Sequence, residues 1–285
     1  MKSYELTLSK MKCTSILKEC SHISSNKNMK KIFDAKLRCK IHRREILDLS
    51  QKVQALHIGG SFSSVEIVDC IYNICLRKRD KFILSKGHAG IIQYVLLYYL
   101  KIISKKELNS YCQKGGYLGV HPDFGKKGIN ASTGSLGHGL GMVSGMALAK
   151  KDSTYYVLLS DGELHEGSVW ESALIIGALN LTNIVLIIDN NDLQSSTRSS
   201  ETHPNLYPIS KKFKEFGWES SNCNGHSTEE IFKKIKSRKG KKPFALIAKT
   251  MKGYPVSFMK NVALWHYRSP NENEYKQAIE EINNL

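Results

Sequence analysis

The sequence predicts an α/β fold, with a doubly wound, mainly parallel sheet and helices on both of its faces. Three short, uninterrupted apolar runs, at residues 155–159, 184–188 and 244–248, have the character of strands that are buried on both sides. Between the first two runs, residues 169–181 have the length and composition of a helix. Strand, helix and strand in this order are typical of a parallel sheet whose crossovers are helical.

The other elements follow from periodicity and turn signals. Apolar side chains recur every three or four positions between residues 36 and 56, which predicts an amphipathic helix. A glycine-bearing loop at residues 57–61 separates it from a second helical run at residues 65–76. A further helix should begin just after Ser227, because Ser227 and Glu230 have the spacing of a capping box ahead of the third strand.

The chain of 285 residues is long enough for one large domain or two small ones. No internal repeat or low-complexity linker divides residues 35–285, so we expect a single domain there. Residues 1–34 begin with a stretch that has no clear period, and we expect them to form a loose N-terminal extension.

The chain is strongly basic, with a formal net charge of +16 at pH 7. Residues 1–52 hold 13 Lys and Arg against 5 Asp and Glu, and residues 208–252 hold 12 against 4. Lysine-rich helix faces in contact with solvent are the plainest explanation, and phosphorylated substrates or an acidic partner surface are the alternatives. The basic runs lack interleaved aromatic residues and a recognisable module, so nucleic-acid binding is not expected.

The cysteine pattern and the hydropathy predict a cytoplasmic protein. The seven cysteines are odd in number and form no C-x-x-C pair, which argues against a disulfide scaffold or a structural zinc site. No run approaches 18 uninterrupted apolar residues, and the first residues lack an apolar signal core. We therefore expect no membrane association.

Polar residues follow two of the predicted strands at the point where each strand ends. Asp161 comes after the first strand, in the segment Ser160-Asp-Gly-Glu163, and Asn191 comes after the second. The carboxyl ends of parallel strands meet at one edge of a sheet, where ligands bind in this fold class. A carboxylate, an amide oxygen and a backbone carbonyl, completed by phosphate and water, suit an octahedral Mg²⁺. The alternative is a capped turn followed by an asparagine-rich loop.

Five of the ten histidines lie in segments that contain glycine or proline rather than on apolar helix faces. An imidazole suits sugar hydroxyls, diphosphate oxygens and proton transfer near pH 7. These five are His57, His88, His121, His138 and His266.

In combination, these motifs resemble the N-terminal half of transketolases, and most closely the short chains that form the first subunit of two-gene transketolases. Asp161 and Asn191 stand 30 residues apart, as in the thiamine-diphosphate motif of that family. The resemblance runs from about residue 35 to the end of the chain and includes further segments. These are residues 85–89, 121–122, 132–139 and 265–266. The resemblance implies the thiamine-diphosphate-binding fold, in its diphosphate-type form.

The resemblance also implies roles for individual residues. It implies that Mg²⁺ is bound by the side chains of Asp161 and Asn191 and by the backbone carbonyl of Leu193. The residues implied in binding the cofactor are His88, Gly134, Ser135, Leu136, Gly162, Glu163, Asn191 and His266. The residues implied in contacting the sugars and moving protons are His57, His121 and His266. Glu166 resembles a glutamate at the boundary of the two half-sites, and by itself it would be a helix acid favoured by the dipole.

Several parts of the chain depart from the family pattern, including the residues next to His57 and His121. Ser160 stands in place of the first glycine of the motif, where its Cβ would slightly crowd the turn. His138 stands where many transketolases have Gln. Residues 194–200 differ from the loop that is usual in sugar-phosphate transketolases, which leaves the identity of the substrate open.

The implied activity is the transfer of a two-carbon ketol unit from a ketose to an aldose, with thiamine diphosphate and Mg²⁺. A full transketolase is more than twice this length, so the pyrimidine-type and C-terminal domains should come from a second subunit, in an assembly of two copies of each chain. We expect an exposed apolar face around Glu166 and residues 140–148. The expected substrates are sugars or sugar phosphates, with a nucleotide-linked sugar as a further acceptor.

Two other functions are compatible with parts of the pattern. The α-subunit of a thiamine-diphosphate 2-oxo acid dehydrogenase, or a related decarboxylase, carries the same diphosphate motif, but residues 85–89, 121–122 and 265–266 favour a transketolase. A non-catalytic basic interaction protein would require the pairing of Asp161 with Asn191 to be accidental.

Overall fold

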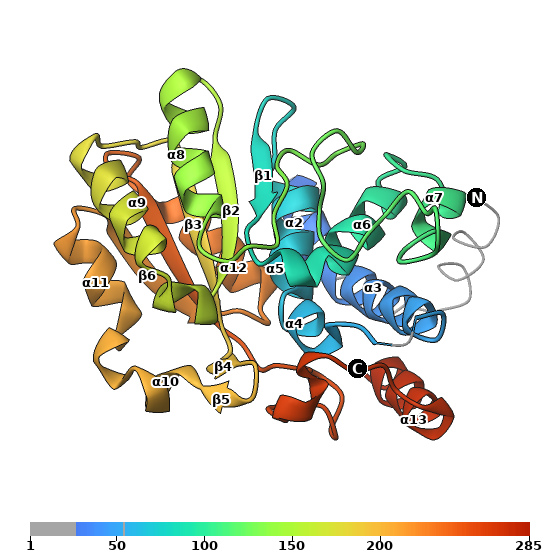
Figure 1. Cartoon of the computed structure of the whole chain (residues 1–285). Helices are drawn as coiled ribbons and strands as arrows, with labels where there is room; N and C mark the ends of the chain where they lie inside the picture. The colour runs from blue at the N-terminus through green and yellow to red at the C-terminus, as the bar shows by residue number, and fades with distance from the viewer. Residues whose placement is uncertain (1–26, 54) are drawn as a thin grey trace, which may run out of the picture.

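The computed structural model describes residues 27–53 and 55–285, with a five-stranded parallel sheet at its centre (Figure 1). The strands lie in the order β1-β2-β3-β7-β6, and each neighbouring pair is parallel. Their bounds are β1 (Lys81–Leu84), β2 (Tyr155–Ser160), β3 (Ile184–Asn190), β6 (Glu219–Asn224) and β7 (Phe244–Lys249). A short antiparallel pair, β4 (Leu193–Gln194) and β5 (Thr197–Arg198), follows β3. The predicted fold class is confirmed.

Helices cover both faces of the sheet. On the side of the larger hydrophobic core lie α3 (Ala35–Ser50), α4 (Ile58–Ser63), α5 (Val65–Cys70), α6 (Gly90–Tyr99), α12 (Thr228–Ser237) and α13 (Glu272–Asn283). On the side of the smaller core lie α8 (Gly139–Ala149), α9 (Gly167–Ala178) and α11 (Ile209–Glu215). The shorter helical elements are α2 (Lys27–Phe33), η3 (Ile71–Cys75), η4 (Gly87–Ala89), α7 (Lys105–Asn109), η5 (Gly162–His165), α10 (Ser199–Thr202), η6 (Pro204–Leu206) and η7 (Ala263–His266).

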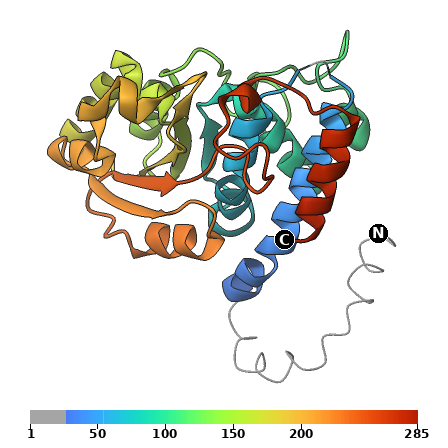
Figure 2. The same cartoon turned by 90° about the horizontal axis from the view of Figure 1, so that it is seen from below.

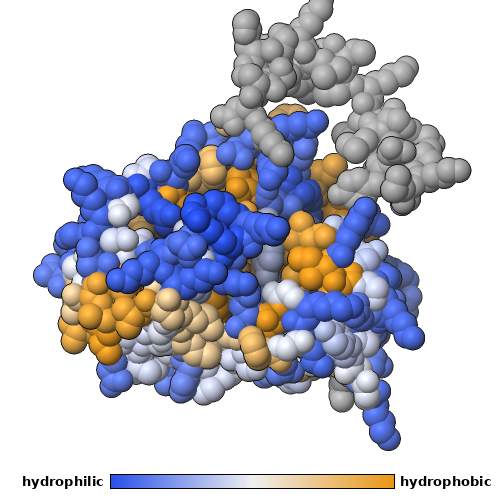
Figure 3. Space-filling model, turned by 90° about the horizontal axis from the view of Figure 1, so that it is seen from above, coloured by the Kyte–Doolittle hydropathy of each residue, from blue (hydrophilic) through white to orange (hydrophobic). Residues whose placement is uncertain are grey.

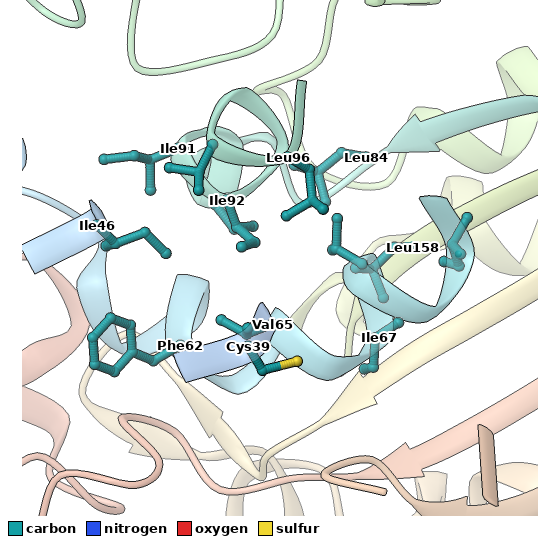
Figure 4. Packing of buried hydrophobic residues seen from close by; sticks show 14 of the residues in the cluster. Cys39, Ile46, Phe62, Val65, Ile67, Leu84, Ile91, Ile92, Leu96 and Leu158 are labelled. Atoms are coloured by element: carbon teal, nitrogen blue, oxygen red, sulfur yellow. The ribbon is translucent and has the colours of Figure 1, made fainter. Parts of the chain in front are cut away.

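Alternate side chains of the central strands pack into the two cores, as the pleat of a strand requires. In β2, Tyr156 and Leu158 belong to the larger core, whereas Val157 and Leu159 belong to the smaller one. Figure 4 shows part of the larger core, where Leu158 of the sheet and Ile67 of α5 belong to one cluster. Every residue of β2 is buried, which explains why this strand is an uninterrupted apolar run in the sequence.

The three predicted strands are confirmed as β2, β3 and β7, but apolar runs do not reveal the two edge strands. β1 is only four residues long, and β6 has the polar sequence ESSNCN. An edge strand pairs with one neighbour only and is less enclosed by side chains, so it does not need a continuous apolar run. Continuous apolar runs therefore do not identify edge strands of this kind.

The helices differ from the prediction in several respects. The first amphipathic helix, α3, ends at Ser50, earlier than predicted. The helical run at residues 65–76 is divided into α5 and the π-helix η3. Ser227 does cap α12 by accepting a hydrogen bond from Glu230 N, but the Glu230 carboxylate accepts from Asn224 N. The predicted capping box is therefore only half formed.

Both ends of the described chain lie on the side of the larger core. Of the expected N-terminal extension, residues 1–26 lie outside the described residues. Residues 27–33 form α2, where Lys31 Nζ donates a hydrogen bond to Asn73 O at 2.5 Å. At the C-terminal end, α13 lies along α3 (Figure 2).

In the part of the chain that the structure describes, no helix combines the length and the apolar composition that a membrane crossing needs. The described cysteines are free thiols: Cys39, Cys70, Cys75, Cys112 and Cys223. Cys70 and Cys75 have their Sγ atoms 3.9 Å apart.

Candidate functional site

The carboxyl ends of β2 and β3 meet and bring the two halves of the predicted metal motif together. Ser160 lies beside Asp189 in the parallel register of these strands. One residue further, Asp161 N donates to Asp189 O at 3.2 Å, and the Asp161 carboxylate accepts a hydrogen bond from Asp192 N. Because Asp192 follows Asn191 directly, Asp161 and Asn191 stand at the same edge of the sheet.

Three residues at this edge carry oxygen atoms of the kind that could hold a magnesium ion. Asp161 is buried, and burial, followed by the charge of Asp189, raises the pKa of its carboxyl to about 7. A cation would relieve this unfavourable negative charge. The Asn191 side-chain oxygen, which accepts from Leu193 N at 3.1 Å, and the Leu193 carbonyl are hard donors of the kind that Mg²⁺ prefers. Within residues 27–53 and 55–285, no three His, Cys, Asp or Glu side chains form a competing metal cluster.

A buried ion pair whose formation was not predicted from the sequence lies next to these donors. The side chains of Lys86 and Asp189 are both fully buried. Lys86 Nζ donates to the Asp189 carboxylate and, at 2.9 Å each, to Ser64 Oγ and Gly60 O. Burial alone would raise the pKa of Asp189, but the Lys86 ammonium and the hydrogen bonds from Lys86, Ser63 and Thr250 together lower this pKa. Thr250 Oγ1 also donates to Asp189, so the pair fixes the end of β3 against three other segments.

Lys252 is a second buried lysine that could not be assigned from a motif. Its Nζ donates to Leu193 O at 3.2 Å and lies 2.8 Å from His266 Nδ1. Burial, followed by the charge of Lys86, lowers the pKa of Lys252 to about 8. Ammonium groups beside a metal site favour an anion such as a diphosphate. The one signal for Lys252 in the sequence is its position after the third predicted strand, at the ligand-binding edge of the sheet.

Three histidines form a cluster beside Lys252. The ring centroid of His57 lies 5.4 Å from that of His88 and 5.3 Å from that of His266, and the rings of His88 and His266 lie 5.9 Å apart. Burial lowers the pKa of His57 and of His266 to about 4 and that of His88 well below its usual value, with nearby positive charges adding to the effect. Among the described residues, the buried His57 Nδ1 has no hydrogen-bond partner. Neutral imidazoles donate and accept hydrogen bonds, which suits hydroxyl groups.

His121 joins this cluster from a separate, exposed loop. The electrostatic influence of His121 is the second cause, after burial, of the low pKa of His57. The Tyr94 hydroxyl donates to His121 O at 2.7 Å and fixes the loop. Gly134 has a φ of +146°, and a Cβ at this position would lie only 3.0 Å from His121 Cγ. Glycine is therefore required where the predicted cofactor loop approaches His121.

The buried Glu163 side chain links three segments of the site through hydrogen bonds. It is buried, which raises the pKa of its carboxyl, and it accepts hydrogen bonds from Ser85 Oγ at 2.5 Å, Gly137 N at 3.0 Å and Ser160 N at 2.9 Å. Ser160 Oγ accepts from Glu163 N at 3.3 Å in return, and Ser160 has no positive φ. The expected crowding at Ser160 is thus not visible in its backbone, and its hydroxyl contributes to the turn.

The remaining residues that the family resemblance implied lie at the same edge of the sheet. Their side chains are more exposed than Asp161, Glu163 and Lys252. Ser135, His138 and Glu166 are exposed, and Leu136 is half-buried. His138 Nδ1 lies 2.9 Å from Leu136 O. Glu166 is the N-cap residue of α9, and its side chain makes no capping hydrogen bond within the described residues. These side chains stand where a ligand or a second chain can reach them.

Several proteins are similar to this chain in sequence. The family model described as "Transketolase, thiamine diphosphate binding domain" matches residues 36–282. The chain is 36% identical over 256 residues to one of the subunits of the apulose-4-phosphate transketolase of Phocaeicola vulgatus, covering 85% of this chain and 91% of that protein. It is 30% identical over 265 residues to the 6-deoxy-6-sulfo-D-fructose transketolase subunit SqwG of Clostridium sp. (strain MSTE9), covering 87% of this chain and 96% of that protein.

Solved structures share the fold over part of their length. Transketolase from Leishmania mexicana matches with a TM-score of 0.81 at 20% identity, over 87% of this chain and 41% of that one. Transketolase from Campylobacter jejuni matches with a TM-score of 0.79 at 24% identity, over 89% of this chain and 43% of that one. The chain thus aligns with less than half of these longer proteins, and with nearly the whole of the two transketolase subunits. It therefore belongs to the transketolase family, of which it carries the thiamine-diphosphate-binding domain.

Proposed function

We propose that this chain is the first subunit of a two-subunit transketolase, which transfers a two-carbon ketol unit from a ketose to an aldose. The observation that carries this proposal is the meeting of three oxygen donors, two buried lysines and three neutral imidazoles at one edge of the sheet. When bound, thiamine diphosphate supplies the stabilised carbanion that such a transfer needs. The two relatives named as transketolase subunits support the same assignment.

In this proposal the chain binds the diphosphate end of the cofactor. Asp161, Asn191 and the carbonyl of Leu193 would hold Mg²⁺, which would neutralise part of the diphosphate charge. Lys252, whose Nζ donates to Leu193 O, would offer its ammonium group to the diphosphate, and Lys86 would keep Asp189 neutralised. Further contacts to the cofactor are assigned to His88, Gly134, Ser135, Leu136, Gly162, Glu163 and His266. Of these, Glu163 acts through its backbone, because its carboxylate accepts hydrogen bonds from three protein groups.

The substrate-binding role belongs to His57, His121 and His266. Two of them, His57 and His266, are neutral at pH 7 because burial lowers the pKa of each to about 4. A neutral imidazole accepts a hydrogen bond from a sugar hydroxyl at one nitrogen and donates one at the other. The same groups can take a proton from a hydroxyl and return it, which is the acid–base work that ketol transfer requires.

We infer that the substrates are sugars that carry an anionic group. One of the relatives is named for a phosphorylated sugar and another for a sulfonated one. The net charge of +16 suits negatively charged substrates. A nucleotide-linked sugar has the same kind of charge and is the alternative acceptor. Free thiols at the described cysteines accord with a reducing cytoplasm as the place of action.

We further propose that residues 35–285 act as one domain and that a second subunit covers the outer face of α8 and α9. Leu148 of α8 is 50% exposed, Leu174 and Ile175 of α9 are 55% and 52% exposed, and Leu179, directly after α9, is 52% exposed. Figure 3 shows hydrophobic surface on the side of the molecule where these two helices lie. A chain that works alone rarely exposes such a contiguous apolar face. Two copies of each subunit would complete the assembly.

This contact surface can be tested by sedimentation of the two purified subunits. Ile175→Asp should separate them, because it places a charge in an apolar contact. Lys276→Asp on α13, an exposed position on the opposite side of the sheet, should leave the assembly intact. Association of the Ile175→Asp variant at the wild-type concentration would show that the partner binds elsewhere.

Cofactor calorimetry and a transfer assay test the proposed function. The chain with its partner should bind thiamine diphosphate only when Mg²⁺ is present, and should then move a ketol unit from hydroxypyruvate to an aldose. An α-subunit of a 2-oxo acid dehydrogenase would bind the cofactor but form no ketose product. Failure to bind thiamine diphosphate under these conditions would refute both enzyme functions and leave an interaction protein.

A further inference from the structure

Tyr267 is a large aromatic side chain that stands exposed directly beside the histidine cluster. It is 56% exposed, and its ring centroid lies 4.5 Å from that of His57. Within the described residues, its hydroxyl makes no hydrogen bond. The ring is not buried in a core, and no hydrogen bond of its hydroxyl to the described residues fixes it in place. Packing alone therefore does not explain why an aromatic side chain stands at this position.

The backbone on both sides of Tyr267 is firmly held. Arg268 N donates to Leu56 O at 3.0 Å, and His57 and Arg268 form a parallel bridge. The Arg268 guanidinium donates to both oxygens of Glu274, at 2.7 and 2.8 Å, and lies 4.4 Å from the ring centroid of Trp265, which is buried. The tyrosine ring is therefore presented from a fixed frame, which reduces the entropy lost when it binds a ligand.

A series of contacts leads outward from the proposed metal site and ends at Tyr267. Lys252 Nζ lies 3.2 Å from Leu193 O and 2.8 Å from His266 Nδ1. The rings of His266 and His57 are 5.3 Å apart, and the rings of His57 and Tyr267 are 4.5 Å apart. Tyr267 is the most exposed member of this series. Only a substrate that extends from the reacting atoms toward the surface can reach it.

Resting on the proposed function, we propose that Tyr267 is a specificity-determining residue that stacks on the carbon chain of a long sugar substrate. A sugar offers hydroxyl groups, which imidazoles bind, and C–H groups between them, which form an apolar strip. The adjacent His57 and Tyr267 provide one surface of each kind. Substrates of five carbons gain this contact, and two-carbon substrates do not.

The experiment uses the complex with the partner subunit, thiamine diphosphate and Mg²⁺, with hydroxypyruvate as the donor. The acceptors are glycolaldehyde, D-ribose and D-ribose 5-phosphate. Tyr267→Ala should raise the KM for both five-carbon acceptors about 3- to 10-fold and leave the KM for glycolaldehyde unchanged. Tyr267→Phe keeps the ring and should stay within about twofold of the wild type for each acceptor. Leu264→Ala, a control at a 64% exposed position in the same segment, should change none of these values.

Each other outcome overturns the inference in a recognisable way. An equal change in KM for glycolaldehyde and D-ribose would mean a structural role, and no change would mean no contact. A change confined to D-ribose 5-phosphate would place the contact at the phosphate rather than at the carbon chain. Weaker binding of Tyr267→Ala to the partner would make the ring an interface residue. If the wild-type complex transfers a ketol unit to none of the acceptors, the proposed function fails and the inference fails with it.

Discussion

Two parts of the candidate site differ in burial and in completeness. The floor, defined as Lys86, Asp161 and Asp189, is no more than 1% exposed, and its charged groups have hydrogen-bond partners within the chain. The rim, defined as His121 and Tyr267, consists of exposed side chains on loops. The chain builds the floor by its own folding, whereas the rim presents open surfaces. Changes in the floor should therefore affect cofactor binding and stability, and changes in the rim should affect turnover or substrate affinity.

The largest expected effect is the loss of cofactor binding on changing the floor. Asp161→Ala removes the one carboxylate of the proposed donor set, so Mg²⁺-dependent binding of thiamine diphosphate should become undetectable by calorimetry. The fold should persist, because the change removes a buried charge at the end of a strand. Asp152→Ala, at a carboxylate whose side chain is 59% exposed, is the matched control. Wild-type affinity in the Asp161 variant would contradict the floor as the metal site.

A change in the rim should lower the rate and leave the cofactor in place. His121→Ala should reduce ketol transfer about 10²- to 10⁴-fold, since it removes a group that can move a proton. Its thiamine-diphosphate affinity and its free energy of unfolding should match the wild type, because His121 is exposed. Steady-state transfer with the partner subunit measures the effect, and the exposed His203→Ala serves as the control. A rate within a factor of two of the wild type would remove His121 from the site.

The buried ion pair of the floor should matter for folding. Lys86→Met leaves the Asp189 carboxylate without its positive partner in a fully buried place, which should reduce the free energy of unfolding by about 3–5 kcal/mol. Denaturant unfolding of the chain without cofactor measures this change. Lys127→Met, at the exposed pair with Glu107, should cause little change. Equal stability of the two variants would show that the floor is not held by this pair.

The smallest expected effect concerns pH and tests whether burial sets the pKa values of the histidines. Burial, followed by the charge of Arg38, lowers the pKa of His42 from 6.5 to about 3. Below pH 6.5 the unfolded chain binds a proton at this residue and the folded chain does not, so the free energy of unfolding falls as the pH is lowered. At pH 5 this loss should be about 2 kcal/mol. His42→Gln should remove it, whereas the exposed His138→Gln should not; the same acid loss in His42→Gln would contradict burial as the cause.

The fold could be predicted where the sequence signal is local. β2, β3 and β7 are continuous apolar runs because both of their faces are covered, and their order with α9 predicts parallel pairing. β6 could not be predicted, because a polar edge strand depends on its pairing with β7 rather than on its own composition.

The residues of the candidate site also differ in how far their positions could be predicted from the sequence. Asp161 and Asn191 could be predicted, because strand ends in a parallel sheet converge and the spacing is read directly from the chain. Lys252 and Asp189 could not, because their partners are 59 and 103 residues away along the chain. Their roles depend on which loops the fold brings together, and a lysine after a strand has the same local sequence whether it is buried or exposed.

The central claim is that this chain carries the metal and diphosphate half of a site that a second subunit completes. Ketol transfer from hydroxypyruvate to an aldose, measured for the purified chain with thiamine diphosphate and Mg²⁺, with and without that subunit, tests the claim directly. The account predicts no turnover by the chain alone and restored turnover on addition of the partner. Ketol transfer by the isolated chain, in a preparation free of other transketolases, would contradict it.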